Sequence, residues 1–163
     1  MPLYIRGEDI SLMRQIAREF IGRVVAEEVV YYKFSLADSV VNRYGECKEK
    51  FFYPGVVLTL LIDREDQITE DTEYGPDTTQ QTEFQFLRDD LVDLNLVPEK
   101  GDIIMYRNIY FEVHNIVENQ YESGKYPEYA LSDATQNFGS SWSILCQCHQ
   151  TRTTKLNITK DRL

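Results

Sequence analysis

The chain has 163 residues and a formal net charge of −10, with 27 acidic and 17 basic residues. That length suits one domain with a substantial core. The acidic balance argues against a protein that grips nucleic acid through its phosphates, because such proteins need a basic surface. Aromatic residues make up 12% of the chain, which favours strands and interfaces over a plain helical bundle.

The first periodic segment spans residues 9–24. Glu8 and Asp9 at its start suit the positive end of a helix dipole and argue against a signal peptide. The apolar residues recur at three- and four-residue spacing, which places them on one helix face: Ile10, Met13, Ile16, Ala17, Phe20 and Val24. We expect one amphipathic helix that packs on a sheet or on a neighbouring subunit.

The rest of the chain is dominated by β-forming segments. Strands are predicted at 28–36, 51–62, 79–88, 103–106, 109–117 and 141–152. Pro54 and Gly55 indicate a bend in the second strand, and residues 89–96 a short helical turn. The longest apolar run, Val56 to Ile62, is too short to span a bilayer, so we expect a soluble protein with no membrane partner.

This series of elements predicts a mainly β fold, a small antiparallel β-barrel or sandwich with one N-terminal amphipathic helix and long interface loops. The prediction assigns the chain to a single domain, 1–163, with the helix at about 9–24, the β core at about 28–152 and a basic C-terminal tail at 153–163.

The clearest local signal is a β-hairpin over residues 101–118. A Pro-Glu-Lys-Gly-Asp turn at 98–102 leads into the strand IIMY, and a tight turn at Arg107-Asn108 leads into IYFEVHNIV. The alternation on both sides predicts that core-facing residues include Ile103, Met105, Phe111 and Val113.

Two long polar segments interrupt this series of short connections. Residues 63–82 are polar and acidic, and residues 119–140 are polar but contain several aromatic residues. Loops of this length in a compact domain usually have a function, and aromatic side chains on them need a surface to pack against. We therefore expect subunit contacts through Tyr121, Tyr126, Tyr129 and Phe138, with Arg152 and Lys155 of the tail.

The candidates for chemistry are few. Cys146, Cys148 and His149 lack the paired C-x-x-C spacing of structural zinc sites, and on a strand His149 points away from both cysteines. The odd number of cysteines (three) favours a reducing compartment over a disulfide framework. The acidic segment does not match a calcium-binding loop, and no catalytic motif is present in the sequence. We expect no catalytic residues, no metal and no cofactor.

Residues 44–118 resemble the neck, or head-completion, proteins of long-tailed bacteriophages, especially those with contractile tails. The similar pieces are Tyr44-Gly45-Glu46, Tyr53-Pro54, Tyr74-Gly75, the turn and strand PEKGDIIMY at 98–106, and YFEV at 110–113. The resemblance extends through Gly124-Lys125 and Cys146 to Leu156-Asn157-Ile158, so that it covers about three quarters of the chain. The N-terminal helix is a departure from the pattern.

The resemblance implies a structural subunit of the virion that is assembled in the host cytoplasm. It implies a homo-oligomeric ring of about six or twelve copies, with a portal or adaptor protein above it and a tail terminator or tail tube protein below it. Double-stranded DNA would pass through without sequence-specific binding. The alternatives are a tail-terminator or baseplate structural protein, or a stand-alone ligand-binding barrel or enzyme.

The charge distribution is compatible with such a ring. Between Asp63 and Glu99 there are twelve acidic residues against two arginines, whereas the C-terminal tail is basic. We expect part of the acidic stretch to face the central channel, through Glu65, Asp66, Glu70 and Asp71. The alternative places these acids on the outside, or beside the basic tail of the next subunit.

Overall fold

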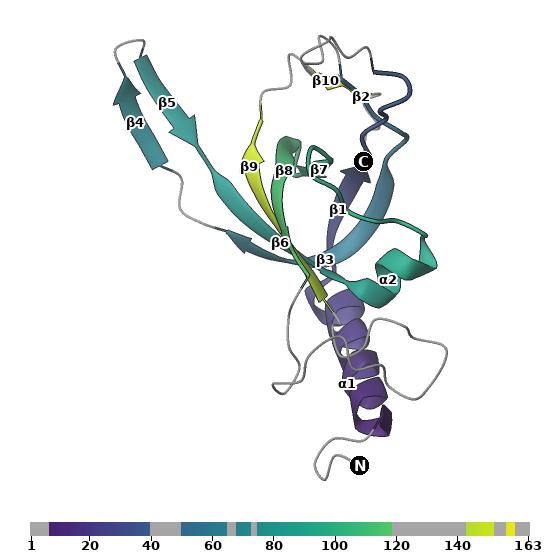
Figure 1. Ribbon diagram of the computed structural model, residues 1–163. Helices are drawn as coiled ribbons and strands as arrows, with labels where there is room; N and C mark the ends of the chain where they lie inside the picture. Colours follow the sequence, from purple (N-terminus) through teal and green to yellow (C-terminus); the bar gives the residue numbers. More distant parts are fainter. Residues whose placement is uncertain are drawn as a thin grey trace.

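The computed structural model describes residues 7–39, 50–64, 68–72, 75–118, 143–151 and 156–158. Its centre is a closed antiparallel barrel with the strand order β1-β3-β6-β9-β8-β7 (Figure 1). The barrel strands are β1 (Glu27–Tyr32), β3 (Val56–Arg64), β6 (Gln81–Leu87), β7 (Ile103–Tyr106), β8 (Ile109–Val117) and β9 (Ser143–Gln150). The predicted mainly β barrel with an N-terminal helix is confirmed.

The hairpin predicted at 101–118 is present as β7 and β8. Arg107 and Asn108 both have positive φ, 48° and 65°, as a two-residue type I′ turn requires, and the strands pair from Tyr106 opposite Ile109 to Ile103 opposite Glu112. The turn therefore lies where the sequence placed it.

The barrel interior is filled by every second residue of its strands. The main cluster contains the aromatic side chains Tyr31, Phe84, Phe86 and Phe111, packed mainly edge to face. Thr82, Phe84 and Phe86, at every second position of β6, are buried. Interior packing of this kind is the main source of stability in a small barrel.

A second cluster lies on the other face of β1, β7 and β8. It consists of Val30, Tyr32, Ile103, Met105 and Tyr110, and it is covered by Phe52, Leu156 and Ile158. The four hairpin residues predicted to face the core are all buried, but they do not share one core. Ile103 and Met105 belong to this outer cluster, whereas Phe111 and Val113 face the interior.

Two short strands provide the cover for this outer cluster. β2 (Lys50–Phe51) pairs in parallel with β10 (Leu156–Asn157). Strand β10 lies inside the segment predicted as a basic tail, so Leu156 and Ile158 of that segment pack on the barrel. Between β2 and β3, a Cβ atom on Gly55 would lie 2.4 Å from Cγ1 of Val30, which explains the glycine at the predicted bend.

The N-terminal helix, predicted at 9–24, consists of two parts. α1 (Gly7–Glu19) continues into a π-helix, η1 (Phe20–Val25), which ends at Ala26 in the left-handed conformation. Figure 1 shows α1 extending from one end of the barrel. The short helical turn predicted at 89–96 is present as α2 (Arg88–Asp93).

The predicted polar loop at 63–82 is largely β-structure instead. β3 extends to Arg64, and β4 (Ile68–Thr72) pairs antiparallel with β5 (Gly75–Thr79) before β6 begins. The resulting hairpin reaches away from the barrel (Figure 1). Apolar periodicity missed it because a hairpin outside the barrel does not need a buried face.

Asp102 closes the barrel between its first strand and the β7–β8 hairpin. Its buried carboxylate accepts hydrogen bonds from the hydroxyl of Tyr31, the backbone N–H of Phe34 (2.8 Å), the backbone N–H of Glu99 (2.8 Å) and Nζ of Lys33 (3.3 Å). Burial, followed by the charge of Asp102, raises the pKa of Tyr31 well above its usual range, so its hydroxyl stays a donor.

Phe111→Ala should lower the free energy of unfolding by about 3–5 kcal/mol, because it leaves a cavity against Phe84 in the interior cluster. Ile109→Ala, on the same strand but exposed, is the control and should cost well under half as much. Urea unfolding followed by circular dichroism measures both. Equal losses would mean that β8 does not pack as described.

Asp102→Ala should cost about 3–5 kcal/mol, because it removes a buried charge and leaves the Tyr31 hydroxyl and two backbone donors without their acceptor. Glu99→Gln provides the control, since it only weakens an exposed ion pair with Lys33 and should cost less than about 1 kcal/mol. A small effect of Asp102→Ala in the same urea experiment would contradict the closing role of this residue.

Candidate functional site

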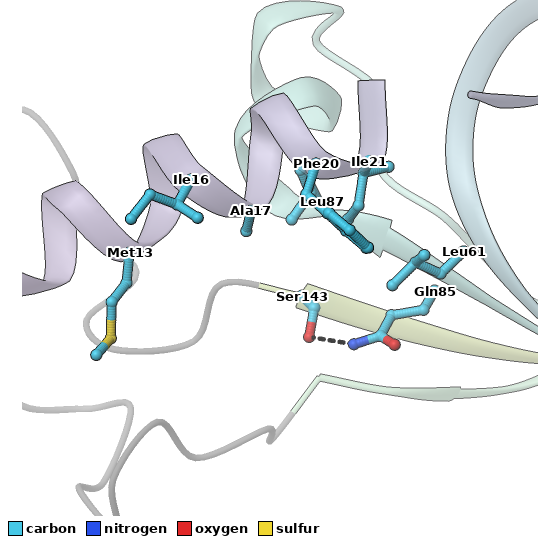
Figure 2. Close-up of a pocket in the computed structure, with 9 residues that line it drawn as sticks. All are labelled: Met13, Ile16, Ala17, Phe20, Ile21, Leu61, Gln85, Leu87 and Ser143. Carbon is cyan, nitrogen blue, oxygen red and sulfur yellow. Dashed lines mark hydrogen bonds between the residues drawn. The ribbon is translucent and has the colours of Figure 1, made fainter. Parts of the chain in front are cut away.

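An apolar groove runs between the N-terminal helix and one end of the barrel, and it has a volume of about 390 Å³. We call it the α1 groove. Figure 2 shows side chains from the helix on one side and from β3, β6 and β9 on the other. The lining residues are Met13, Ile16, Ala17, Phe20, Ile21, Leu61, Gln85, Leu87 and Ser143.

The groove exists because the barrel covers only part of the apolar face of the helix. Ile21 is buried, but Met13, Ile16 and Phe20 are 50%, 58% and 52% exposed. The barrel strands present their outward residues here, and two of these, Gln85 and Ser143, are polar and hydrogen-bonded to each other at 3.1 Å. Leu61 and Leu87 contribute apolar surface beside this polar pair, and the helix face opposite them stays half open.

Ion pairs on another side of the helix fix it in this position. Arg18 contacts Asp90 at 2.9 Å and Asp93 at 2.6 Å, and Arg14 lies 3.9 Å from Asp89. The hydrogen bond to Asp93 raises the pKa of Arg18, whereas burial raises the pKa of Asp90 against the opposing effect of Arg18. These pairs connect α1 to α2 on a side of α1 that does not line the groove.

The sequence predicted the helix contribution to this site and missed the barrel contribution. Met13, Ile16, Ala17 and Phe20 belong to the predicted apolar face. Leu61 and Leu87 were recognisable only as apolar residues at outward positions of their strands, a weak signal that no motif accompanies.

The predicted interface residues are not brought together by the described part of the chain. All six residues of this predicted interface lie outside the described residues: Tyr121, Tyr126, Tyr129, Phe138, Arg152 and Lys155. Their assignment to a subunit contact therefore stays a prediction.

Two of the four predicted channel acids are placed on the projecting hairpin. Glu70 and Asp71 lie on β4, where Glu70 pairs with Asp77 of β5. Glu65 and Asp66 lie outside the described residues. Acidic residues therefore occur on both strands of an arm that extends from the barrel (Figure 1).

Cys146 and Cys148 face the barrel interior, whereas His149 is exposed on the opposite face of β9. The strand alternation predicted this arrangement, and the three side chains do not converge on one point. Among the described residues, no three or more His, Cys, Asp or Glu side chains form a group that could hold a metal ion.

A β-bulge on β8 brings the two histidines of the chain together, which the sequence did not indicate. The register shifts between Val113 and Asn115, and the extra residue, His114, lies with its ring centroid 5.7 Å from that of His149. Both rings are exposed on the outer face of the barrel. A pair of exposed imidazoles without a third ligand does not define a metal centre.

Comparison with known proteins does not assign the chain to a family. No family model matches the chain, and no curated protein matches its sequence significantly. None of the described helices has the length and apolar character needed to cross a membrane.

The two buried thiols should be unreactive in the folded protein. Burial raises the pKa of Cys146 to about 12, with smaller contributions from Asp102 and Glu118, and burial also raises the pKa of Cys148. At pH 8 only about one Cys146 in ten thousand is then a thiolate, the form that reacts. Iodoacetamide at pH 8, followed by peptide mass spectrometry, should label both residues only after denaturation.

The same shift has a consequence for stability. A thiol whose pKa is higher in the folded state than in the unfolded state stabilises the fold while both states are protonated. That contribution decreases as the pH rises above the ordinary value of about 8.5. Rapid labelling of Cys146 in the folded protein at pH 8 would contradict its burial.

Proposed function

We propose that this protein is a structural subunit of a bacteriophage head-to-tail connector, or neck, ring, and that it has no enzymatic activity. The observation that carries the proposal is the α1 groove: an acidic barrel presents a half-exposed apolar helix face at one end. A connector subunit needs surfaces of this kind, because its stability in the particle comes from contacts with its neighbours.

The exposed face of α1 supports assembly on physical grounds. Isolated apolar side chains are common on protein surfaces, but a contiguous apolar patch usually marks a contact site. Met13, Ile16 and Phe20 form such a patch, and the charged residues of α1 that pair with α2 lie elsewhere on the helix. A patch of this type on a chain of net charge −10 favours association by burial of apolar area rather than by charge.

The projecting β4–β5 hairpin supports a role beside DNA. Carboxylates repel the phosphate backbone, so acidic arms around a channel let DNA pass without holding it. Glu70 and Asp71 on β4 would contribute such charges, together with Glu65 and Asp66 of the adjoining segment. In this proposal the ring has about six or twelve copies and lies in the virion, between a portal or adaptor protein and a tail terminator or tail tube protein.

The sequence resemblance supports the same assignment. The turn and strand PEKGDIIMY at 98–106 and the segment YFEV at 110–113 carry it, and both contribute to the closure of the barrel. A tail-terminator or baseplate subunit would use the same kinds of surface, and it is the alternative within the same class.

One observation favours a different class of function. The volume of the α1 groove falls within the range of small-molecule sites, and its lining is apolar with a single polar pair, Gln85 and Ser143. A barrel that binds an apolar ligand at this groove would need no ring. The oligomeric state of the pure protein distinguishes the two functions.

The purified 163-residue chain should assemble into rings as its concentration rises. Light scattering coupled to size-exclusion chromatography measures the mass, and negative-stain images show whether the particles are closed. Assembly through apolar surfaces should persist in 1 M salt, where the screening length is about 3 Å. A protein that stays monomeric and binds an apolar fluorophore stoichiometrically, and loses that binding in Ile16→Asp, would support the ligand-binding alternative instead.

A further inference from the structure

The outer face of the barrel carries an apolar site that the chain itself fills. The outer cluster of β1, β7 and β8 is covered by Leu156 and Ile158, together with Phe52. Leu156 and Ile158 lie two positions apart, so they share one side of an extended segment. We call residues 156–158 the strap, and we call β2 with the apolar surface beneath the strap the acceptor site.

The strap is held by a short ladder. β10 pairs with β2 over two residues, Leu156 opposite Lys50 and Asn157 opposite Phe51, in the parallel arrangement that is slightly less stable than the antiparallel one. The two strands form a sheet of their own beside the barrel (Figure 1), and a two-stranded sheet is marginally stable by itself. Leu156 and Ile158 are only half-buried. The strap can therefore leave the barrel at low cost.

The acceptor site, in contrast, is firmly attached to the barrel. Segments 33–35 and 51–53 are joined by two backbone hydrogen bonds of 2.9 Å, and Lys50 of β2 pairs with Glu112 of β8 at 2.7 Å. The side chains under the strap belong to β1, β7 and β8, which pair with one another in the closed barrel. These contacts do not involve the strap, so the site persists when the strap leaves. It then offers an edge of β2 and an apolar surface to an extended segment.

The contacts of the strap do not depend on which copy of the chain supplies it. A strap from a second copy would place the same leucine and isoleucine on the same cluster, so exchange between copies has a low cost. Four residues, 152–155, separate Leu156 from Thr151, whose backbone N–H binds the Tyr110 carbonyl at 2.9 Å. Short hinges before an exchangeable element favour domain swapping. Because this one spans at most about 17 Å, the donor must be an adjacent copy.

We propose that the acceptor site of one subunit binds the strap of the next copy of this chain, as a parallel strand added to β2. The strap and the acceptor site are different surfaces, so each copy gives its strap to one neighbour and receives a strap from another. This head-to-tail exchange repeats from copy to copy, as a closed ring requires. The inference rests on the proposed function, since it names the segment that links neighbouring subunits.

A disulfide between two paired positions tests the exchange. Phe51 and Asn157 are partners in the ladder, and partners in a sheet lie within the Cα distance that a disulfide needs. One variant carries Phe51→Cys and a second carries Asn157→Cys. Both also carry Cys47→Ser, whereas Cys146 and Cys148 stay because they are buried. In a mixture of the two variants, a bridge between positions 51 and 157 can form only between two copies.

The mixture, oxidised at a concentration at which light scattering shows assembly, should give covalent heterodimers joined through positions 51 and 157. Peptide mass spectrometry identifies the bridge. In the control mixture, Tyr53→Cys replaces Phe51→Cys. Tyr53 is exposed and lies two positions, about 7 Å, further along the chain, so its bridge to position 157 should be about tenfold rarer. Thermal unfolding checks that each variant folds. If Phe51→Cys does not fold, the other ladder pair, Lys50→Cys with Leu156→Cys, replaces it.

A variant with both cysteines in one chain shows how far the exchange extends. Oxidation should give a covalent series larger than the dimer on a denaturing gel. A series that ends at the dimer would support strand exchange and count against the ring. If the bridge stays within single chains, or if the mixture gives no more of it than the control, this inference is wrong. Rings that form without such bridges leave the proposed connector function standing. A protein that is monomeric at every concentration would count against both proposals.

Discussion

The buried carboxylate of Asp102 is the constraint on which the barrel depends. A barrel closes only when its first strand pairs with the hairpin that lies far away in the sequence, here β1 with β7. Asp102 accepts hydrogen bonds from the Tyr31 hydroxyl and the Phe34 backbone on one side, and from the Glu99 backbone on the other. Burying a charge is costly unless it is fully hydrogen-bonded. Because these donors have fixed positions, the carboxylate also favours a single register for the two strands.

Closure of the barrel determines which surfaces remain available. Once the interior is filled by one face of each strand, the other face must be covered or solvated. At β1, β7 and β8 it is covered by Phe52, Leu156 and Ile158. At the ends of β3, β6 and β9 the helix covers it only partly, and Met13, Ile16 and Phe20 stay half exposed there. The apolar surface of α1 that results is a cost to an isolated chain, and in the proposed assembly it would be an advantage, since a neighbour could bury it.

Charge has a separate role from apolar burial in this molecule. The ion pairs of Arg14 and Arg18 connect α1 to α2, although an exposed pair such as that of Arg18 with Asp93 contributes little to stability. Their value lies in position: they hold α2 against a side of α1 that does not line the groove. In the proposed ring, the acids of the β4–β5 hairpin would act at longer range, because repulsion of phosphates requires a negative potential rather than a particular contact.

The sequence by itself determined the local elements. Alternation and turn residues were sufficient for the β7–β8 hairpin and for the placement of His149 opposite Cys146 and Cys148. Three- and four-residue spacing was sufficient for the apolar face of the N-terminal helix. Only the tertiary structure decided that Ile103 and Met105 belong to an outer cluster, that 68–79 contains a projecting hairpin, and that Leu61 and Ser143 meet the helix. The physical reason is that a period of two tells which residues share a face of a strand. What covers that face depends on segments distant in sequence, and their pairing is not encoded in any local pattern.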